Sequence, residues 1–191
     1  DEPLGSLDAL LRDQLIIELR DIIKSIGLTA VYVTHDQKEA YAIADQIAIM
    51  NQGYIEQVDT PQNIYYRPKT EFVARFLGLS NIFPTEANFL KALDLQDNDL
   101  GEANAILIHP AGIRLSGSDS DIQLSGTILQ KVFRGELYEI VMQIADEKLL
   151  RWTTQQADVD VGEDVIVEIN REFVVKFAKA IYTRRLTLLC F

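Results

Sequence analysis

The sequence predicts an α/β domain at residues 1–79, followed by a small all-β barrel or sandwich at residues 80–191. Up to Gly78, apolar residues at helical spacing alternate with a continuous β-prone run, which is typical of α/β folds. Beyond Gly78, short β-prone runs follow one another with Gly, Asp and Asn between them, as in small barrels and sandwiches. We therefore expect the domain boundary within residues 79–85.

The first helix is expected over residues 9–26. It lies between Asp8, a residue type that caps helix N-termini, and Gly27, a residue type that ends helices. The following run, residues 29–34, is β-prone and hydrophobic without alternation. Such a run is typical of a strand covered on both faces, so we expect it to belong to a parallel sheet.

Short elements complete both predicted domains. In the first domain they are a helix opened by the capping-box spacing of Asp36 and Glu39, a strand pair at 47–50 and 54–58, a helix begun by Thr60-Pro61, and a helix that ends at Gly78. In the second domain the β-prone runs are 105–108, 124–133, 137–145, 148–152 and 165–169. Apolar residues alternate within several of these runs, which predicts strands with one buried face.

Composition excludes several classes of protein. The 191 residues carry a net charge of −11, which argues against a protein that grips nucleic acid through its phosphates. The single cysteine, Cys190, excludes an internal disulfide framework and a multi-cysteine zinc site. No apolar run approaches the ~18 residues of a membrane-spanning helix, so we do not expect the chain to cross a bilayer.

Acidic residues and a histidine are predicted to meet at one edge of the parallel sheet. If a strand ends at Asp1, the helix at 9–26 and the strand at 29–34 complete a βαβ unit, whose parallel strands end at the same edge. Asp1, Glu2 and His35 would then converge there. Two carboxylates and an imidazole suit phosphoryl transfer to water: one carboxylate holds Mg²⁺, the other activates the water, and the imidazole contacts the γ-phosphate.

Three parts of the sequence resemble motifs of the ABC-transporter ATPases. Residues 1–8 (Asp-Glu-Pro-Leu-Gly-Ser-Leu-Asp) resemble the end of the Walker B motif running into the D-loop, and residues 33–37 (Val-Thr-His-Asp-Gln) resemble the H-loop. Residues 50–61 together with 72–78 are similar to the family's importer subunits, which append a regulatory β-rich domain of TOBE-like, OB-like type. The resemblance is dense over residues 1–81 and thin beyond them. It implies a P-loop NTPase-type parallel sheet in the first domain.

The resemblance also implies roles for five residues. Asp1 would hold Mg²⁺, largely through water, and Glu2 would be the catalytic base. Ser6 and Asp8 would belong to the loop that communicates across an ATP-sandwich dimer. His35 would be the switch residue that senses the γ-phosphate of ATP.

Part of the ATPase machinery is missing from this sequence. A Walker A loop needs Gly-Lys followed by Ser or Thr, and none of the ten glycines is followed by Lys. We therefore expect the chain to be the C-terminal portion of an ABC-importer ATPase subunit, and to hydrolyse no ATP by itself. The resemblance implies that the intact protein forms a homodimer, binds transmembrane permease subunits, and lies peripherally at the cytoplasmic face of the membrane. It favours an inorganic ion such as ferric iron or sulfate as the imported solute, and leaves polyamines and sugars open.

Other interpretations stay open at this point. The leading alternative is a non-catalytic regulatory, dimerisation or oxyanion-binding β module that carries an ATPase remnant. A nucleic-acid-binding barrel ranks third because of the charge. Residue by residue, Asp8 also suits a simple N-cap, Trp152 a core position, Cys190 a buried strand, residues 115–118 a turn, and His109 a structural position. His109-Pro110-Ala111 stands where the family often has Arg-Pro-Glu.

Overall fold

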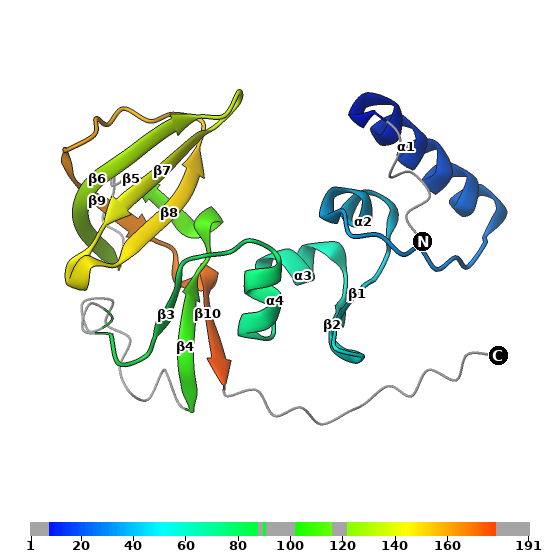
Figure 1. The fold of residues 1–191 in the computed structure, drawn as a ribbon, viewed down its shortest axis with the longest axis horizontal. Coiled ribbons are helices and arrows are strands. Elements are labelled where there is room, and N and C mark those ends of the chain that lie inside the picture. The colour runs from blue at the N-terminus through cyan, green and yellow to red at the C-terminus, as the bar shows by residue number, and fades with distance from the viewer. Residues whose placement is uncertain (1–7, 88–89, 91–101, 116–121, 179–191) are drawn as a thin grey trace. The chain divides into compact units, whose positions relative to one another are not determined.

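The computed structural model describes residues 8–87, 90, 102–115 and 122–178 (Figure 1). Within these ranges the chain divides into two compact units, a first unit at residues 8–67 and a second unit at 68–178. The units divide at Arg67 and Pro68, before the predicted boundary region. Compactness alone does not test the predicted domains 1–79 and 80–191, which therefore stay a prediction.

The first unit consists of three helices and one hairpin. Its elements are α1 (Ala9–Ile26), α2 (Gln37–Ile43), β1 (Ile47–Asn51), β2 (Tyr54–Asp59) and α3 (Pro61–Tyr66). The hairpin is antiparallel and turns at Gly53, whose φ of 82° suits glycine. Thr60 caps α3 by accepting the backbone N–H of Asn63 at 3.3 Å, and Pro61 occupies the start of that helix, as predicted.

Helix α1 has the predicted limits because its caps have the predicted chemistry. The side chain of Asp8 accepts the backbone N–H of Leu11 at 3.0 Å. Gly27 ends the helix in the left-handed conformation, with φ of 65°. The backbone N–H of Leu28 then donates to the carbonyl of Ile23 at 3.0 Å, which completes the C-terminal cap. No helix among the described residues is both long and apolar enough to span a membrane.

The predicted strand at residues 29–34 is wrong. These residues form an irregular connection between α1 and α2, and every strand pair in the described parts of the chain is antiparallel. A strand exists only through the hydrogen bonds of a neighbouring strand, and no described strand lies beside this run. Its apolar side chains are exposed instead of covered on both faces: Val31 is 93% exposed and Val33 is 55% exposed.

The second unit contains two antiparallel sheets. One has the order β10-β4-β3 and the other β5-β9-β6-β7-β8. The strands are β3 (Ile82–Pro84), β4 (Ala103–Ile108), β5 (Ile113–Leu115), β6 (Gln123–Phe133), β7 (Tyr138–Gln143), β8 (Leu149–Thr154), β9 (Asp164–Ile169) and β10 (Val174–Ala178). The described helix and 3₁₀ turns of this unit are α4 (Glu71–Phe76), η2 (Pro110–Gly112), η3 (Ala145–Glu147) and η4 (Arg171–Phe173). The five-stranded sheet curls into a half barrel, which agrees with the predicted OB-like all-β fold (Figure 1).

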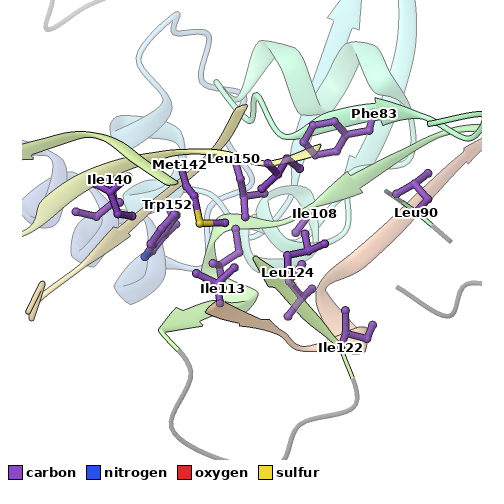
Figure 2. Packing of buried hydrophobic residues seen from close by; sticks show 14 of the residues in the cluster. Phe83, Leu90, Ile108, Ile113, Ile122, Leu124, Ile140, Met142, Leu150 and Trp152 are labelled. Atoms are coloured by element: carbon purple, nitrogen blue, oxygen red, sulfur yellow. The ribbon is translucent and has the colours of Figure 1, made fainter. Parts of the chain in front are cut away.

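One hydrophobic core fills the second unit (Figure 2). Strand β9 contributes the alternate residues Val167 and Ile169 to this core, as the sequence pattern predicts. Strand β7 differs, because Ile140, Val141 and Met142 are buried in succession, and Ile140 and Met142 belong to this core. Trp152 of β8 is 2% exposed, so its predicted core position is confirmed. The core members shown with labels in Figure 2 are Phe83, Leu90, Ile108, Ile113, Ile122, Leu124, Ile140, Met142, Leu150 and Trp152.

Candidate functional site

Two of the five predicted site residues, Asp8 and His35, belong to the described part of the chain, whereas Asp1, Glu2 and Ser6 lie outside it. The convergence of Asp1 and Glu2 with His35 therefore stays a prediction. Among the described residues, no group of three or more His, Cys, Asp or Glu side chains could hold a metal ion.

His35 lies in a tight bend directly before α2, with its side chain exposed. The two residues that flank it are hydrogen-bonded to each other. The hydroxyl oxygen of Thr34 accepts the backbone N–H of Asp36 at 3.0 Å. Asp36 in turn caps α2, since its carboxylate accepts the backbone N–H groups of Lys38 at 2.8 Å and Glu39 at 3.4 Å. The backbone on both sides of His35 is thereby fixed to the start of a helix.

The side chain of Glu39 accepts hydrogen bonds from two residues that precede His35. Its side chain is buried, with 5% of the residue exposed. Oxygen Oε2 accepts a hydrogen bond from the hydroxyl of Thr34 at 2.6 Å and another from the hydroxyl of Tyr32 at 3.0 Å. The capping box predicted for Asp36 and Glu39 is thus half formed: Asp36 caps the helix, but Thr34 rather than Glu39 receives the N–H of Asp36.

Arg12 connects this network to helix α1. Its guanidinium lies between two acidic side chains, with Nε 3.7 Å from Oε1 of Glu39 and Nη1 3.7 Å from Oδ2 of Asp36. A buried carboxylate is costly unless it is paired and hydrogen-bonded, and Glu39 has both kinds of partner. The backbone N–H of Arg12 donates to the carbonyl of Asp8 at 3.0 Å, so the first turn of α1 is joined to the bend at His35.

The environment of Tyr32 keeps its hydroxyl protonated. Burial is the largest cause, followed by the hydrogen bond to Glu39 and the negative charge of Glu39, and together they raise the pKa of Tyr32 to about 12. Like any tyrosine, Tyr32 is protonated and can donate at neutral pH, and its raised pKa extends this state to more alkaline pH. This state matches the geometry, in which the carboxylate of Glu39 can only accept.

A second set of contacts joins the other end of α1 to the end of α2. Lys24 pairs with Asp45 through Nζ, at 2.6 Å from Oδ1, and the guanidinium of Arg20 donates to the carbonyl of Ala42. The hydrogen bond from Lys24, reinforced by its positive charge, lowers the pKa of Asp45. Both partners of this pair are exposed, so the pair adds little to stability.

Two buried polar residues of the second unit, His109 and Asn81, hold its backbone in place. His109 is fully buried, and its Nδ1 accepts the backbone N–H of Ala111 at 3.2 Å, which caps η2. The structural position predicted for His109 is therefore confirmed. Sequence reasoning missed Asn81, which is also fully buried. Its amide nitrogen donates to the carbonyls of Ile108 at 3.1 Å and Arg151 at 2.7 Å, and its amide oxygen accepts the N–H of Arg151 at 2.8 Å.

No periodicity could have revealed Asn81, because its role depends on two strands that lie far from it in the sequence. The same holds for Thr34 and Glu39, whose hydrogen bond crosses the bend at His35. The spacing of Asp36 and Glu39 was the available signal there. It predicted the correct helix start and a different partner for Glu39.

Comparison with known proteins finds relatives over most of the chain. Residues 106–177 match the TOBE domain family. The spermidine/putrescine import ATP-binding protein PotA of Borreliella afzelii (strain PKo) is 38% identical over 179 residues, which are 88% of this chain and 51% of that protein. The uncharacterized ABC transporter ATP-binding protein YdcT of Escherichia coli (strain K12) is 37% identical over 182 residues, 92% of this chain and 51% of that protein.

A shorter match has a higher identity. PotA of Nostoc sp. (strain PCC 7120) is 55% identical over 96 residues, which are 50% of this chain and 25% of that protein. The chain spans about half the length of the curated relatives that it matches over most of its own length. The TOBE match at residues 106–177 and the similarity over 88–92% of the chain support the prediction that the chain is the C-terminal part of an ABC-importer ATP-binding subunit.

Proposed function

We propose that the intact protein is the ATP-hydrolysing subunit of an ABC importer and that this chain supplies its switch histidine and its regulatory β domain. The observation that carries the proposal is the identity of 37–38%, over 88–92% of the chain, with an import ATP-binding protein and an ABC transporter ATP-binding protein. In this proposal two copies bind ATP and Mg²⁺ between them. They act on transmembrane permease subunits and lie at the cytoplasmic face of the membrane through those partners.

The described residues fit the roles proposed for them. His35 is exposed at a bend whose two sides are hydrogen-bonded, which suits a side chain that must reach a ligand from a fixed position. Bound Mg²⁺-ATP would supply the phosphoryl group and the charge neutralisation that its transfer needs. We assign Mg²⁺ binding to Asp1, general-base action on water to Glu2, and communication between the two subunits to Ser6 and Asp8.

We further propose that the imported solute is a polyamine. Two of the relatives compared above carry spermidine and putrescine in their names, whereas none of the names mentions ferric iron or sulfate, the ions favoured by the sequence analysis. Uptake by the reconstituted importer tests this choice. We expect labelled spermidine or putrescine to enter proteoliposomes when ATP is present, and labelled sulfate or ferric iron not to enter.

ATP hydrolysis is tested on the intact subunit with its permease partners. We expect Glu2→Gln and His35→Ala each to lower turnover by about 100-fold or more, because each removes a group that acts in the transition state. The isolated 191-residue chain is expected to release no phosphate, because positioning and electrostatic contributions act together in such sites. Glu2-dependent turnover by the isolated chain, or full activity of both variants of the intact protein, would contradict the proposal.

A second candidate function is an oxyanion-binding or dimerising β module. The separate hydrophobic core of the second unit and its match to the TOBE family favour it. Calorimetric titration of the 191-residue chain with sulfate, phosphate and molybdate tests binding, and sedimentation of residues 80–191, without the apolar surface of the first unit, tests pairing of the β module. Heat of binding that saturates at one site per chain, or a dimer of residues 80–191, supports this candidate, whereas no binding and monomeric residues 80–191 leave the ATPase subunit as the sole proposal.

A further inference from the structure

The hydroxyl of Thr34 closes the bend around His35 and anchors it at the same time. It accepts the backbone N–H of Asp36 on the far side of His35 at 3.0 Å, and it donates to Oε2 of Glu39 at 2.6 Å. The hydroxyl of Thr34 therefore links Thr34 to Asp36, the two neighbours of His35, and links this pair to the buried carboxylate of Glu39. The bend has little freedom to move while both hydrogen bonds are present.

Glu39 is held in turn from three directions. It lies in the first turn of α2, it accepts from Tyr32 at 3.0 Å as well as from Thr34, and Arg12 of α1 lies 3.7 Å from its second oxygen. The position of its carboxylate is therefore set by both helices. Because Arg12 also lies close to Asp36, the charges of Asp36 and Glu39 face one cation that comes from α1.

We propose that Thr34 and Glu39 are positioning residues for His35 and that Arg12 sets the His35 bend against the first turn of α1. The inference rests on the proposed role of His35 in ATP hydrolysis. Neither Thr34 nor Glu39 needs to touch the nucleotide. Their effect is to keep the imidazole where a transition-state contact is possible, and a misplacement of ~1 Å can cost about 100-fold in rate.

The geometric part of the proposal is tested without ATP. The chain contains two histidines, so the imidazole signals of His35 and His109 can be assigned in an NMR spectrum of the 191-residue chain. Thr34→Val keeps the shape of the side chain and removes the hydroxyl, whereas Thr34→Ser keeps the hydroxyl. We expect the backbone N–H of Asp36 to exchange with solvent about tenfold faster or more in Thr34→Val.

The two histidines provide the internal comparison. In Thr34→Val the His35 signals should shift and broaden while those of His109 stay unchanged, and Thr34→Ser should resemble the wild type. Far-UV circular dichroism confirms that both variants keep their helices. An Asp36 exchange rate and a His35 signal that are unchanged in Thr34→Val would overturn the proposed anchoring.

The functional part is tested in the intact subunit with its permease partners. We expect Thr34→Val and Glu39→Ala to lower kcat by about tenfold, with KM for ATP within about twofold of the wild type. Thr34→Ser should restore kcat to within about twofold, and Glu39→Gln to within about threefold, because its amide oxygen can still accept both hydroxyls. Glu18→Gln, on an exposed position of α1, is the matched control and should leave both constants unchanged.

Two kinds of failure are distinguishable. Wild-type kcat in Thr34→Val and Glu39→Ala, or a raised KM with unchanged kcat, overturns the positioning role while the ATPase proposal stands. An intact wild type that hydrolyses no ATP, or a fully active His35→Ala variant, overturns the proposed function and this role with it. The NMR result then still decides whether Thr34 holds the bend.

Discussion

At the residue scale, four buried polar or charged side chains stand out in the described part of the chain: Glu39, Gln57, Asn81 and His109. Each has a hydrogen-bond partner close in space, as burial requires. Three of them bind backbone groups and so fix the path of the chain. Glu39 differs because it binds side chains, and one of them, Thr34, flanks the candidate switch residue. This difference is the reason to assign function to Glu39 and stability to the others.

Asn81 gives the first prediction at this scale. We expect Asn81→Ala to lower the free energy of unfolding by about 2–4 kcal/mol, because it leaves the N–H and carbonyl of Arg151 and the carbonyl of Ile108 without the amide. Urea denaturation followed by circular dichroism measures the change. Asn104→Ala, at an exposed position of β4, is the matched control and should change stability by less than about 0.5 kcal/mol. Equal losses in the two variants would contradict a role for the buried amide.

Tyr32 gives a pH-dependent prediction. Its pKa is about 12 in the folded protein, above the usual value of a tyrosine near 10, so its contribution to stability is fully present below pH 10. The contribution is lost as the pH rises from about 10 through 12. Burial raises the pKa of Tyr41 and Tyr65 as well, so they act in the same direction. We expect the urea midpoint to fall less between about pH 9 and pH 11 in Tyr32→Phe than in the wild type.

At the element scale, caps and turns are predictable from the sequence and strand partners are not. The limits of α1 follow from Asp8 and Gly27 because capping chemistry is local. The run at 29–34 has the hydrophobicity of a strand without being one, because hydrophobicity reports a tendency to be buried and not the presence of a neighbour. The short strands β3 and β5 have three residues each, too few to show alternation, and β10 was missed as well. Strands β3, β5 and β10 are recognised only from their pairing with neighbouring strands.

Gly126 gives the prediction at this scale. It lies in β6, and a Cβ atom there would overlap the backbone carbonyl oxygen of Gln143 and lie 2.9 Å from Cγ of Met142. Strand β7 is paired on both sides, so its backbone cannot move away cheaply. We expect Gly126→Ala to lower the free energy of unfolding by about 3 kcal/mol or more.

Gly162 is the matched control for that variant. Its φ of 90° is strained for alanine, but beyond its chain neighbours no atom lies within 4 Å of the place that a Cβ would take, so Gly162→Ala should lower stability by about 1 kcal/mol. Thermal and urea unfolding of the two variants separate the effects. If Gly126→Ala lowers the free energy of unfolding less than Gly162→Ala does, the close approach of β6 and β7 does not depend on a glycine at position 126.

At the scale of the whole molecule, the first unit exposes several large apolar side chains. Its large apolar side chains that are more than half exposed are Leu10, Ile17, Ile22, Ile26, Leu28, Val31 and Val33. Large exposed apolar surfaces mark places where a protein, a membrane or a ligand binds. The chain spans about half the length of its relatives, so in an intact subunit we propose that further residues of the same protein cover this surface.

The exposed surface predicts self-association of the isolated chain. We expect the 191-residue chain to form dimers or larger species as its concentration rises in sedimentation velocity, and to enhance the fluorescence of ANS. The double variant Val31→Glu/Val33→Glu should weaken both effects, whereas Gln62→Glu/Gln155→Glu adds the same charge at exposed polar positions and should weaken them less. Equal effects of the two double variants would mean that added charge, and not lost apolar surface, is responsible.

The salt dependence of self-association distinguishes contacts through the apolar surface from contacts through surface ion pairs. The net charge of −11 opposes association, and salt screens that repulsion with a Debye length of ~8 Å at physiological ionic strength. Association driven by the apolar surface should therefore strengthen when sodium chloride is raised. Association through surface ion pairs should weaken under the same change, because salt screens attraction as well. If self-association weakens as salt is raised, charged residues make the contact, and the exposed valines of the 29–34 run are not its cause.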